Sequence, residues 1–196
     1  MRNRLFLSIF YLIIASVLIL SGSASGYEVN KNAIALLIAK DKAGKTVGTG
    51  SGFVAHPEGI LVTNYHVLVD ALTIDVHFPD GSHTDVEGIF KVDRARDFAI
   101  LKLKEGFYST LEIGDSSSLK LYDYTSALGY LSAQVMQQKD MVEGQLVQTY
   151  GFVLGIHSQA HPKIPFIYTT TPFVPGFSGG PVVNSSNKVI GLATVE

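Results

Sequence analysis

The chain has 196 residues, enough for one domain or for two small packed half-domains with a buried core. It contains no cysteine, which excludes disulfides, zinc–thiolate sites and a cysteine nucleophile. The formal net charge is −2 and the basic residues do not cluster, so nucleic acid is not an expected partner.

Residues 1–26 differ in composition from the rest of the chain. Two arginines precede an almost unbroken apolar run over residues 5–20, and small residues follow it up to Gly26. This order predicts a secretory signal peptide. The alternative is an uncleaved N-terminal membrane anchor, because the run approaches the length of a bilayer-spanning helix. In both cases residues 27–196 are exported to a periplasmic or extracellular space, and without the two arginines their net charge is −4.

Residues 27–196 have the pattern of many short strands separated by turns. Residues 71–78 and 98–103 alternate apolar and polar side chains, which is the period of a half-buried strand. No amphipathic helix is expected after residue 26, so the pattern favours an all-β sandwich or barrel. The polar segment 114–122 is predicted to connect two half-domains. Extended segments are expected over 33–39, 48–54, 60–62, 71–78, 85–92, 98–103, 124–130, 145–156, 166–171, 181–184 and 189–195.

Three local clusters carry the residue types of acyl-transfer chemistry, in the chain order His66, Asp97, Ser178. A serine hydroxyl is a poor nucleophile and needs a base to accept its proton, and an imidazole is suited to that task. A carboxylate on the other ring nitrogen holds the imidazole in the correct tautomer. The glycines around Ser178 allow two backbone N–H groups to converge where an oxyanion would form.

Each cluster also has an ordinary explanation. The histidine could be structural, Asp97 could form a surface ion pair with Arg96, and residues 175–181 could be only a tight turn. An esterase of another fold is a further alternative, since residues 176–180 fit the pattern Gly-x-Ser-x-Gly. In that class the histidine follows the serine, whereas here it comes first. The joint occurrence in this order therefore favours a triad.

These segments resemble the trypsin-like serine proteases and, within them, the HtrA/Deg-like branch. The likeness runs from about residue 33 to residue 195 and includes no PDZ domain. The similar segments are 50–54 and 59–67 around the histidine, 97–102 at the aspartate, 113–119 and 127–130 in the middle of the chain, and 170–171 with 175–181 at the serine.

The resemblance implies an all-β fold of two packed six-stranded antiparallel β-barrels, about 30–113 and 122–196, within a protease domain of residues 27–196. It implies that His66 and Asp97 come from the first barrel and Ser178 from the second, with the amides of Gly176 and Ser178 as the oxyanion hole. It further implies a pocket for the residue before the scissile bond, with walls formed by Pro172, Phe173 and Val174 on one side and by Ala193, Thr194 and Val195 on the other.

The activity that the resemblance implies is a serine endopeptidase acting on extended or unfolded polypeptides, without metal or cofactor. Membrane attachment through residues 5–20 and assembly into a homo-oligomer stay open.

Two departures from the family pattern qualify this expectation. Phe177 stands where the family usually has asparagine or aspartate, and we expect it to pack into an apolar patch between the barrels. The sequence stops at Glu196, so the second barrel is expected to be truncated or to be completed in another way. The alternative function is therefore a catalytically impaired pseudoprotease that binds a peptide or partner.

Overall fold

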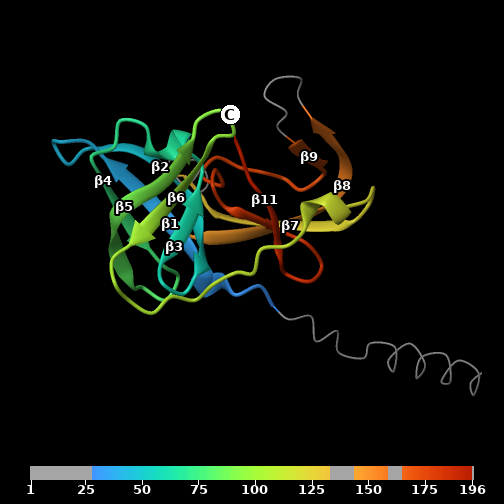
Figure 1. Cartoon of the computed structure of the whole chain (residues 1–196), viewed down its shortest axis with the longest axis horizontal. Coiled ribbons are helices and arrows are strands. Elements are labelled where there is room, and N and C mark those ends of the chain that lie inside the picture. Colours follow the sequence, from blue (N-terminus) through green and yellow to red (C-terminus); the bar gives the residue numbers. More distant parts are fainter. Residues whose placement is uncertain (1–27, 133–143, 159–164, 196) are drawn as a thin grey trace, which may run out of the picture.

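The computed structural model describes residues 28–132, 144–158 and 165–195, so the predicted signal or anchor over 1–26 lies outside the described residues. The described chain forms two β-structures side by side, one from its N-terminal half and one from its C-terminal half (Figure 1). No helix in these ranges is long and apolar enough to cross a membrane.

The N-terminal half is a closed six-stranded barrel with the neighbour order β1-β2-β3-β6-β5-β4. All its strand pairs are antiparallel. In β6 the side chains of Ala99, Leu101 and Leu103 are buried, and those between them are only partly buried. The strands are β1 (Ile34–Lys40), β2 (Thr46–His56), β3 (Ile60–Thr63), β4 (Thr73–His77), β5 (His83–Asp93) and β6 (Phe98–Leu103).

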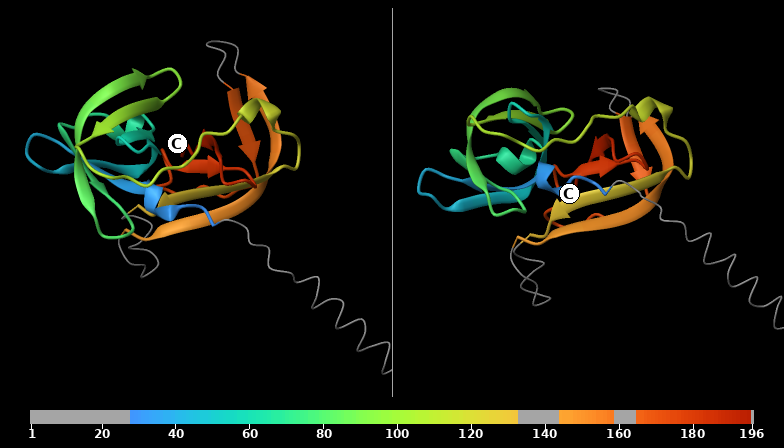
Figure 2. Two further views of the ribbon diagram at one scale, coloured as in Figure 1. Left: turned by 60° about the horizontal axis from the view of Figure 1, so that its bottom comes forward. Right: turned by 90° about the horizontal axis from the view of Figure 1, so that it is seen from below.

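The C-terminal half is a curled five-stranded antiparallel sheet with the order β11-β10-β7-β8-β9 (Figure 2). The predicted all-β double-barrel architecture is thus confirmed, with a second barrel that stays open between β9 and β11 in the described residues. Its strands are β7 (Tyr124–Tyr130), β8 (Leu146–Ser158), β9 (Pro165–Thr169), β10 (Pro181–Val183) and β11 (Val189–Leu192).

An apolar cluster joins the two halves. Ile34 and Phe53 of the barrel pack with Leu128, Tyr130 and Val183 of the sheet, and all five are buried. The connection between the halves is also tied to the sheet, since Ile113 bridges Val189 of β11 and the amide of Gly114 donates to the Val189 carbonyl at 2.7 Å. The halves therefore share a core.

Each predicted strand is present, with bounds that differ by at most three residues. Three short 3-10 helices were not predicted: η1 (Lys31–Ala33), η2 (His66–Leu68) and η3 (Ser116–Ser118). The last strand was expected over 189–195 but ends at Leu192. Just after it, Ala193 exchanges two hydrogen bonds of 2.9 Å with the glycines after Ser178: its carbonyl accepts from the Gly179 amide and its amide donates to the Gly180 carbonyl.

Candidate active site

His66 and Asp97 lie together at the ends of two neighbouring strands. His66 begins η2, just after β3, and Asp97 directly precedes β6. Thr63 pairs with Ala99 where β3 runs beside β6, so these chain segments lie next to each other. The ring Nδ1 of His66 is 2.7 Å from Oδ2 of Asp97, and the His66 amide donates to Oδ1 at 2.8 Å. One carboxylate thus fixes both the backbone and the ring of the histidine, with the second ring nitrogen left for another partner.

The backbone at Asp97 is held in an uncommon conformation. Its φ is 49°, in the left-handed region that non-glycine residues seldom adopt. The Asp97 carbonyl accepts from the Tyr65 amide at 3.2 Å and from Asn64 Nδ2 at 2.7 Å, which holds this conformation in place. The ion pair with Arg96 considered from the sequence does not describe this site, because the Arg96 guanidinium pairs with Asp93 at 3.1 Å.

Ser178 lies against the barrel, on the loop of residues 170–180 between β9 and β10, called the serine loop below. The barrel residue Ser51 donates its amide to the Ser178 carbonyl at 2.8 Å. A Cβ on Gly50 would meet both this carbonyl, at 2.9 Å, and the side chain of Val67, which follows His66, at 2.6 Å. Only a residue without a side chain lets the serine loop approach the histidine segment so closely.

The hydroxyl of Ser178, however, contacts a different partner from the one predicted. Its Oγ is 3.3 Å from both the amide nitrogen and the carbonyl oxygen of Val195. In the described part of the chain, no hydrogen bond joins it to His66. Ser178 as a residue is buried, whereas the side chain of His66 is 42% exposed. The structure therefore brings His66 and Asp97 into contact and places Ser178 beside them with its hydroxyl turned towards the chain after β11.

The predicted oxyanion amides stand apart from the neighbouring amides of the loop. Those of Phe177, Gly179 and Gly180 donate to carbonyls at 2.8–3.0 Å, but those of Gly176 and Ser178 donate to no acceptor within the described ranges. Gly176 has φ 102°, and a Cβ there would lie 2.3 Å from a backbone oxygen of Tyr130. Only glycine fits at this position. The two amides are donors from which an anionic oxygen could accept hydrogen bonds.

Phe177 is fully buried, but not in the place expected. It packs in an apolar cluster of the second half with Ala127, Val182 and Ile190, not between the barrels. The reason is a notch in β7, because a Cβ on Gly129 would come within 2.8 Å of the Phe177 ring. The phenylalanine is thus anchored on its own side of the molecule.

One predicted pocket wall belongs to this loop and the other adjoins it. Phe173, Val174 and Val195 pack, partly buried, against the cluster that contains Phe177. The remaining wall residues are held by the fold: Pro172 accepts from Thr149 at 2.7 Å, Ala193 is buried, and Thr194 Oγ1 is 3.2 Å from Asn64 Nδ2.

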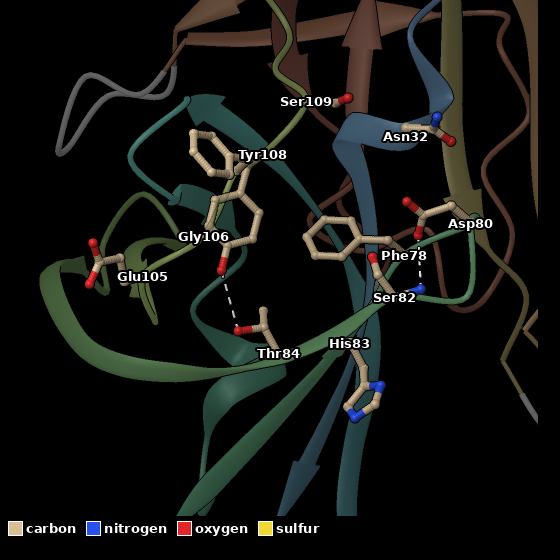
Figure 3. A pocket seen from close by; sticks show the side chains of 11 residues that line it. Asn32, Phe78, Asp80, Ser82, His83, Thr84, Glu105, Gly106, Tyr108 and Ser109 are labelled. Carbon is tan, nitrogen blue, oxygen red and sulfur yellow. Dashed lines mark hydrogen bonds between the residues drawn. The ribbon is translucent and has the colours of Figure 1, made fainter.

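A separate pocket of about 270 Å³ lies on the first barrel, lined by Phe78, Asp80, His83, Glu105 and Tyr108 among others (Figure 3). None of the three predicted triad residues lines it. Within the described ranges, no three His, Asp or Glu side chains are grouped so that they could hold a metal ion.

Ser51 and Asn64 belong to the segments singled out in the sequence, but no role was assigned to them. Both are buried polar residues that contact the site. The signals in the sequence were a serine between two glycines of a strand, at Ser51, and an asparagine two residues before the histidine, at Asn64.

Comparisons with known proteins agree with the fold. Residues 50–192 match the model of the trypsin-like peptidase domain. A putative serine protease HhoB from Synechocystis sp. is 30% identical over 147 residues, which cover 75% of this chain and 34% of that protein. A probable periplasmic serine endoprotease, DegP-like, from Pseudomonas fulva is 32% identical over 143 residues, covering 73% of this chain and 28% of that protein.

The solved structure of the HtrA-type protease AlgW with a tripeptide is also similar, with a TM-score of 0.72 and 25% identity over 86% of this chain and 52% of that one. The chain spans only about a third of the length of the curated relatives named above. With a match over most of its length, it belongs to the trypsin-like peptidase domain family and has HtrA/DegP-like serine proteases as its homologues.

Proposed function

We propose that this chain is a serine endopeptidase that hydrolyses extended or unfolded polypeptides, with His66, Asp97 and Ser178 as its triad. The observation that carries the proposal is the double contact of one carboxylate with both the ring and the amide of His66, beside a loop that bears Ser178. This is the arrangement that fixes the tautomer of a general base. The endoprotease names of the relatives support it.

The chemistry follows from these groups. Ser178 Oγ attacks the scissile carbonyl carbon while His66 takes the hydroxyl proton, and the oxyanion accepts from the amides of Gly176 and Ser178. The C–N bond then breaks as His66 returns the proton to the leaving amine, and an ester to Ser178 remains. Water repeats the sequence and releases the acid. In this structure the Ser178 hydroxyl contacts Val195, so attack requires it to exchange this contact for one with the His66 ring.

A second candidate function rests on that same Val195 contact. If the hydroxyl of Ser178 stays with Val195, residues 27–196 bind a peptide or a partner without turnover. Phe177 points to the same alternative, because this buried apolar side chain stands in the serine loop where the resembled family usually has a polar one.

Labelling of the full chain with a fluorophosphonate probe separates the two functions. A serine with a working base reacts, so the wild type is expected to label, His66→Ala to label far more slowly and Ser178→Ala not at all. Ser118→Ala removes an exposed hydroxyl outside the site and serves as the control. Peptide hydrolysis by the double variant should be no slower than by either single variant, because triad members act as a unit. A wild type that does not label would favour the binding function.

We further propose that the chain is exported, since the Pseudomonas fulva relative is named periplasmic and residues 1–26 have the composition of a signal or anchor. Fractionation of cells that express the full chain tests this. Recovery of the protein with the cytosol would contradict export.

A further inference from the structure

Ser51 of β2 is the barrel residue that holds the serine loop. It is fully buried and comes from the first half of the molecule, 125 positions before its hydrogen-bond partner Gly176. Its hydroxyl donates to the Gly176 carbonyl at 2.7 Å and accepts from the Tyr130 amide at 2.8 Å. Its own amide donates to the Ser178 carbonyl at 2.8 Å, and its carbonyl accepts from Thr63 Oγ1 at 2.7 Å. The amide, carbonyl and hydroxyl of Ser51 thus make four hydrogen bonds, two of them to the loop.

The orientation of the loop can be followed through its peptide planes. Each plane is rigid, so a bond to its carbonyl also sets the direction of the amide in the same plane. The Gly176 amide shares a plane with the Pro175 carbonyl, which accepts from the Ser132 amide at 2.9 Å. The Ser178 amide shares a plane with the Phe177 carbonyl, which accepts from the Gly180 amide at 2.8 Å.

The plane between these two contains the Gly176 carbonyl and the Phe177 amide, and the Ser51 hydroxyl holds that carbonyl. This plane decides how the Gly176 and Ser178 amides point relative to one another. Gly176 supplies little resistance to rotation, since it has no side chain and already has a positive φ. Without the hydroxyl, the Gly176 carbonyl and the Tyr130 amide each lose a hydrogen-bond partner. The peptide plane between Gly176 and Phe177 is then held only by the hydrogen bond from the Phe177 amide to the Val174 carbonyl, at 3.0 Å.

We propose that Ser51 is a positioning residue for the oxyanion hole: its hydroxyl ties the loop to β2 and to β7, so that both donor amides converge on one point. The inference rests on the proposed serine peptidase function and adds to it a role for a residue outside the triad. Ser51 acts through Gly176 and does not touch the reacting atoms.

The test compares Ser51→Ala with a matched variant, Ser126→Ala, in the full chain. Ser126 is likewise buried, in β7, and accepts one side-chain hydrogen bond, from Gln148 Nε2 at 2.8 Å, away from the loop. The substrate is a peptide with an apolar residue before the cleaved bond. The two inhibitors are a trifluoromethyl ketone of the same peptide, which forms an oxyanion on the enzyme, and the corresponding alcohol, which cannot.

Ser51→Ala is expected to lower kcat about tenfold to a hundredfold, somewhat less than the removal of an oxyanion donor itself. KM should change little, and the affinity for the ketone should fall by the same factor as kcat/KM while the affinity for the alcohol is kept. Ser126→Ala should keep the kinetics and both affinities of the wild type, whatever it loses in Tm. A purely structural role for Ser51 would lower Tm without separating the ketone from the alcohol.

Ser51→Cys serves if Ser51→Ala does not fold, because a thiol fills similar space but is a weaker donor and acceptor. It should show the same separation of ketone from alcohol. Folded Ser51 variants with the kcat and ketone affinity of the wild type would overturn the role of Ser51 alone. A wild type that neither cleaves the peptide nor binds the ketone would instead overturn the proposed function, and the role of Ser51 with it.

Discussion

At the scale of single residues, Phe177 shows how this chain holds its serine loop by packing. Its ring lies in the notch left by Gly129, inside an apolar cluster that also contains Ala193. The backbone on either side of it is bonded within the loop, from the Phe177 amide to the Val174 carbonyl at 3.0 Å and from the Gly180 amide to the Phe177 carbonyl at 2.8 Å. Loss of the ring would therefore loosen both the cluster and the loop.

We predict that Phe177→Ala lowers the free energy of unfolding by about 3–5 kcal/mol, because it leaves a cavity among buried side chains. It should also lower kcat, since the adjoining amides lose their anchor. Gly129→Ala should be destabilising too, because its methyl group would occupy the space of the ring. Urea unfolding and peptide hydrolysis measure the two effects. Phe107→Ala is the control, since that side chain is fully exposed, and equal losses in both phenylalanine variants would contradict the anchor.

At the scale of elements, the end of β11 and the segment after β9 are the predicted walls of the substrate pocket. Residues 193–195 follow β11, which ends at Leu192, and contact the serine loop, and Phe173 and Val174 pack against the apolar cluster that contains Phe177. Neither segment contains an acidic or basic residue. A charged substrate side chain would find no partner there, and its burial would be costly.

We therefore predict that the residue before the cleaved bond is apolar and of small to medium size. Cleavage of a peptide library by the full chain, with Ser178→Ala as the blank, measures the preference. Val195→Asp should shift the preference towards lysine and arginine if this segment forms the wall. A strong preference of the wild type for basic residues would mean that the pocket lies elsewhere.

At the scale of the whole molecule, the shared core keeps the two halves in one arrangement. Tyr130 of β7 lies in that core, 3% exposed, and its hydroxyl is 3.5 Å from the Ile34 carbonyl of the barrel. Burial, with a smaller contribution from the negative charge of Asp80, raises the pKa of Tyr130 to about 12 from the ordinary value of 10.0. The buried phenol thus stays neutral between pH 10 and about 12, a range in which an exposed phenol would ionise.

This shift predicts a loss of stability in alkaline solution. Below pH 10 the phenol is protonated in both states, and between pH 10 and about 12 it ionises in the unfolded chain but not in the folded one. Ionisation therefore stabilises the unfolded state relative to the folded state, and the free energy of unfolding falls as the pH rises through this window. Urea titrations of the wild type and of Tyr130→Phe should diverge above pH 10, with the variant falling less steeply. Parallel curves would contradict the role of Tyr130.

The sequence by itself determined the strand pattern, the all-β class and the residue types of the predicted triad. Alternation and turn chemistry are local properties, so the strands at 98–103 and 124–130 could be predicted to the residue. The order of His66, Asp97 and Ser178 is also a property of the chain alone, and the family that it indicates is the one whose model residues 50–192 match.

Only the tertiary structure decided how these segments meet. It turned the Ser178 hydroxyl towards Val195, placed Phe177 in the notch of Gly129 and tied Gly176 to Ser51. These contacts join segments that are far apart in the sequence, and a single hydrogen bond or buried ring leaves no periodic signal in the chain. They depend on which strands become neighbours when the barrel closes and the second sheet curls against it, and that is settled only when the shared core is buried.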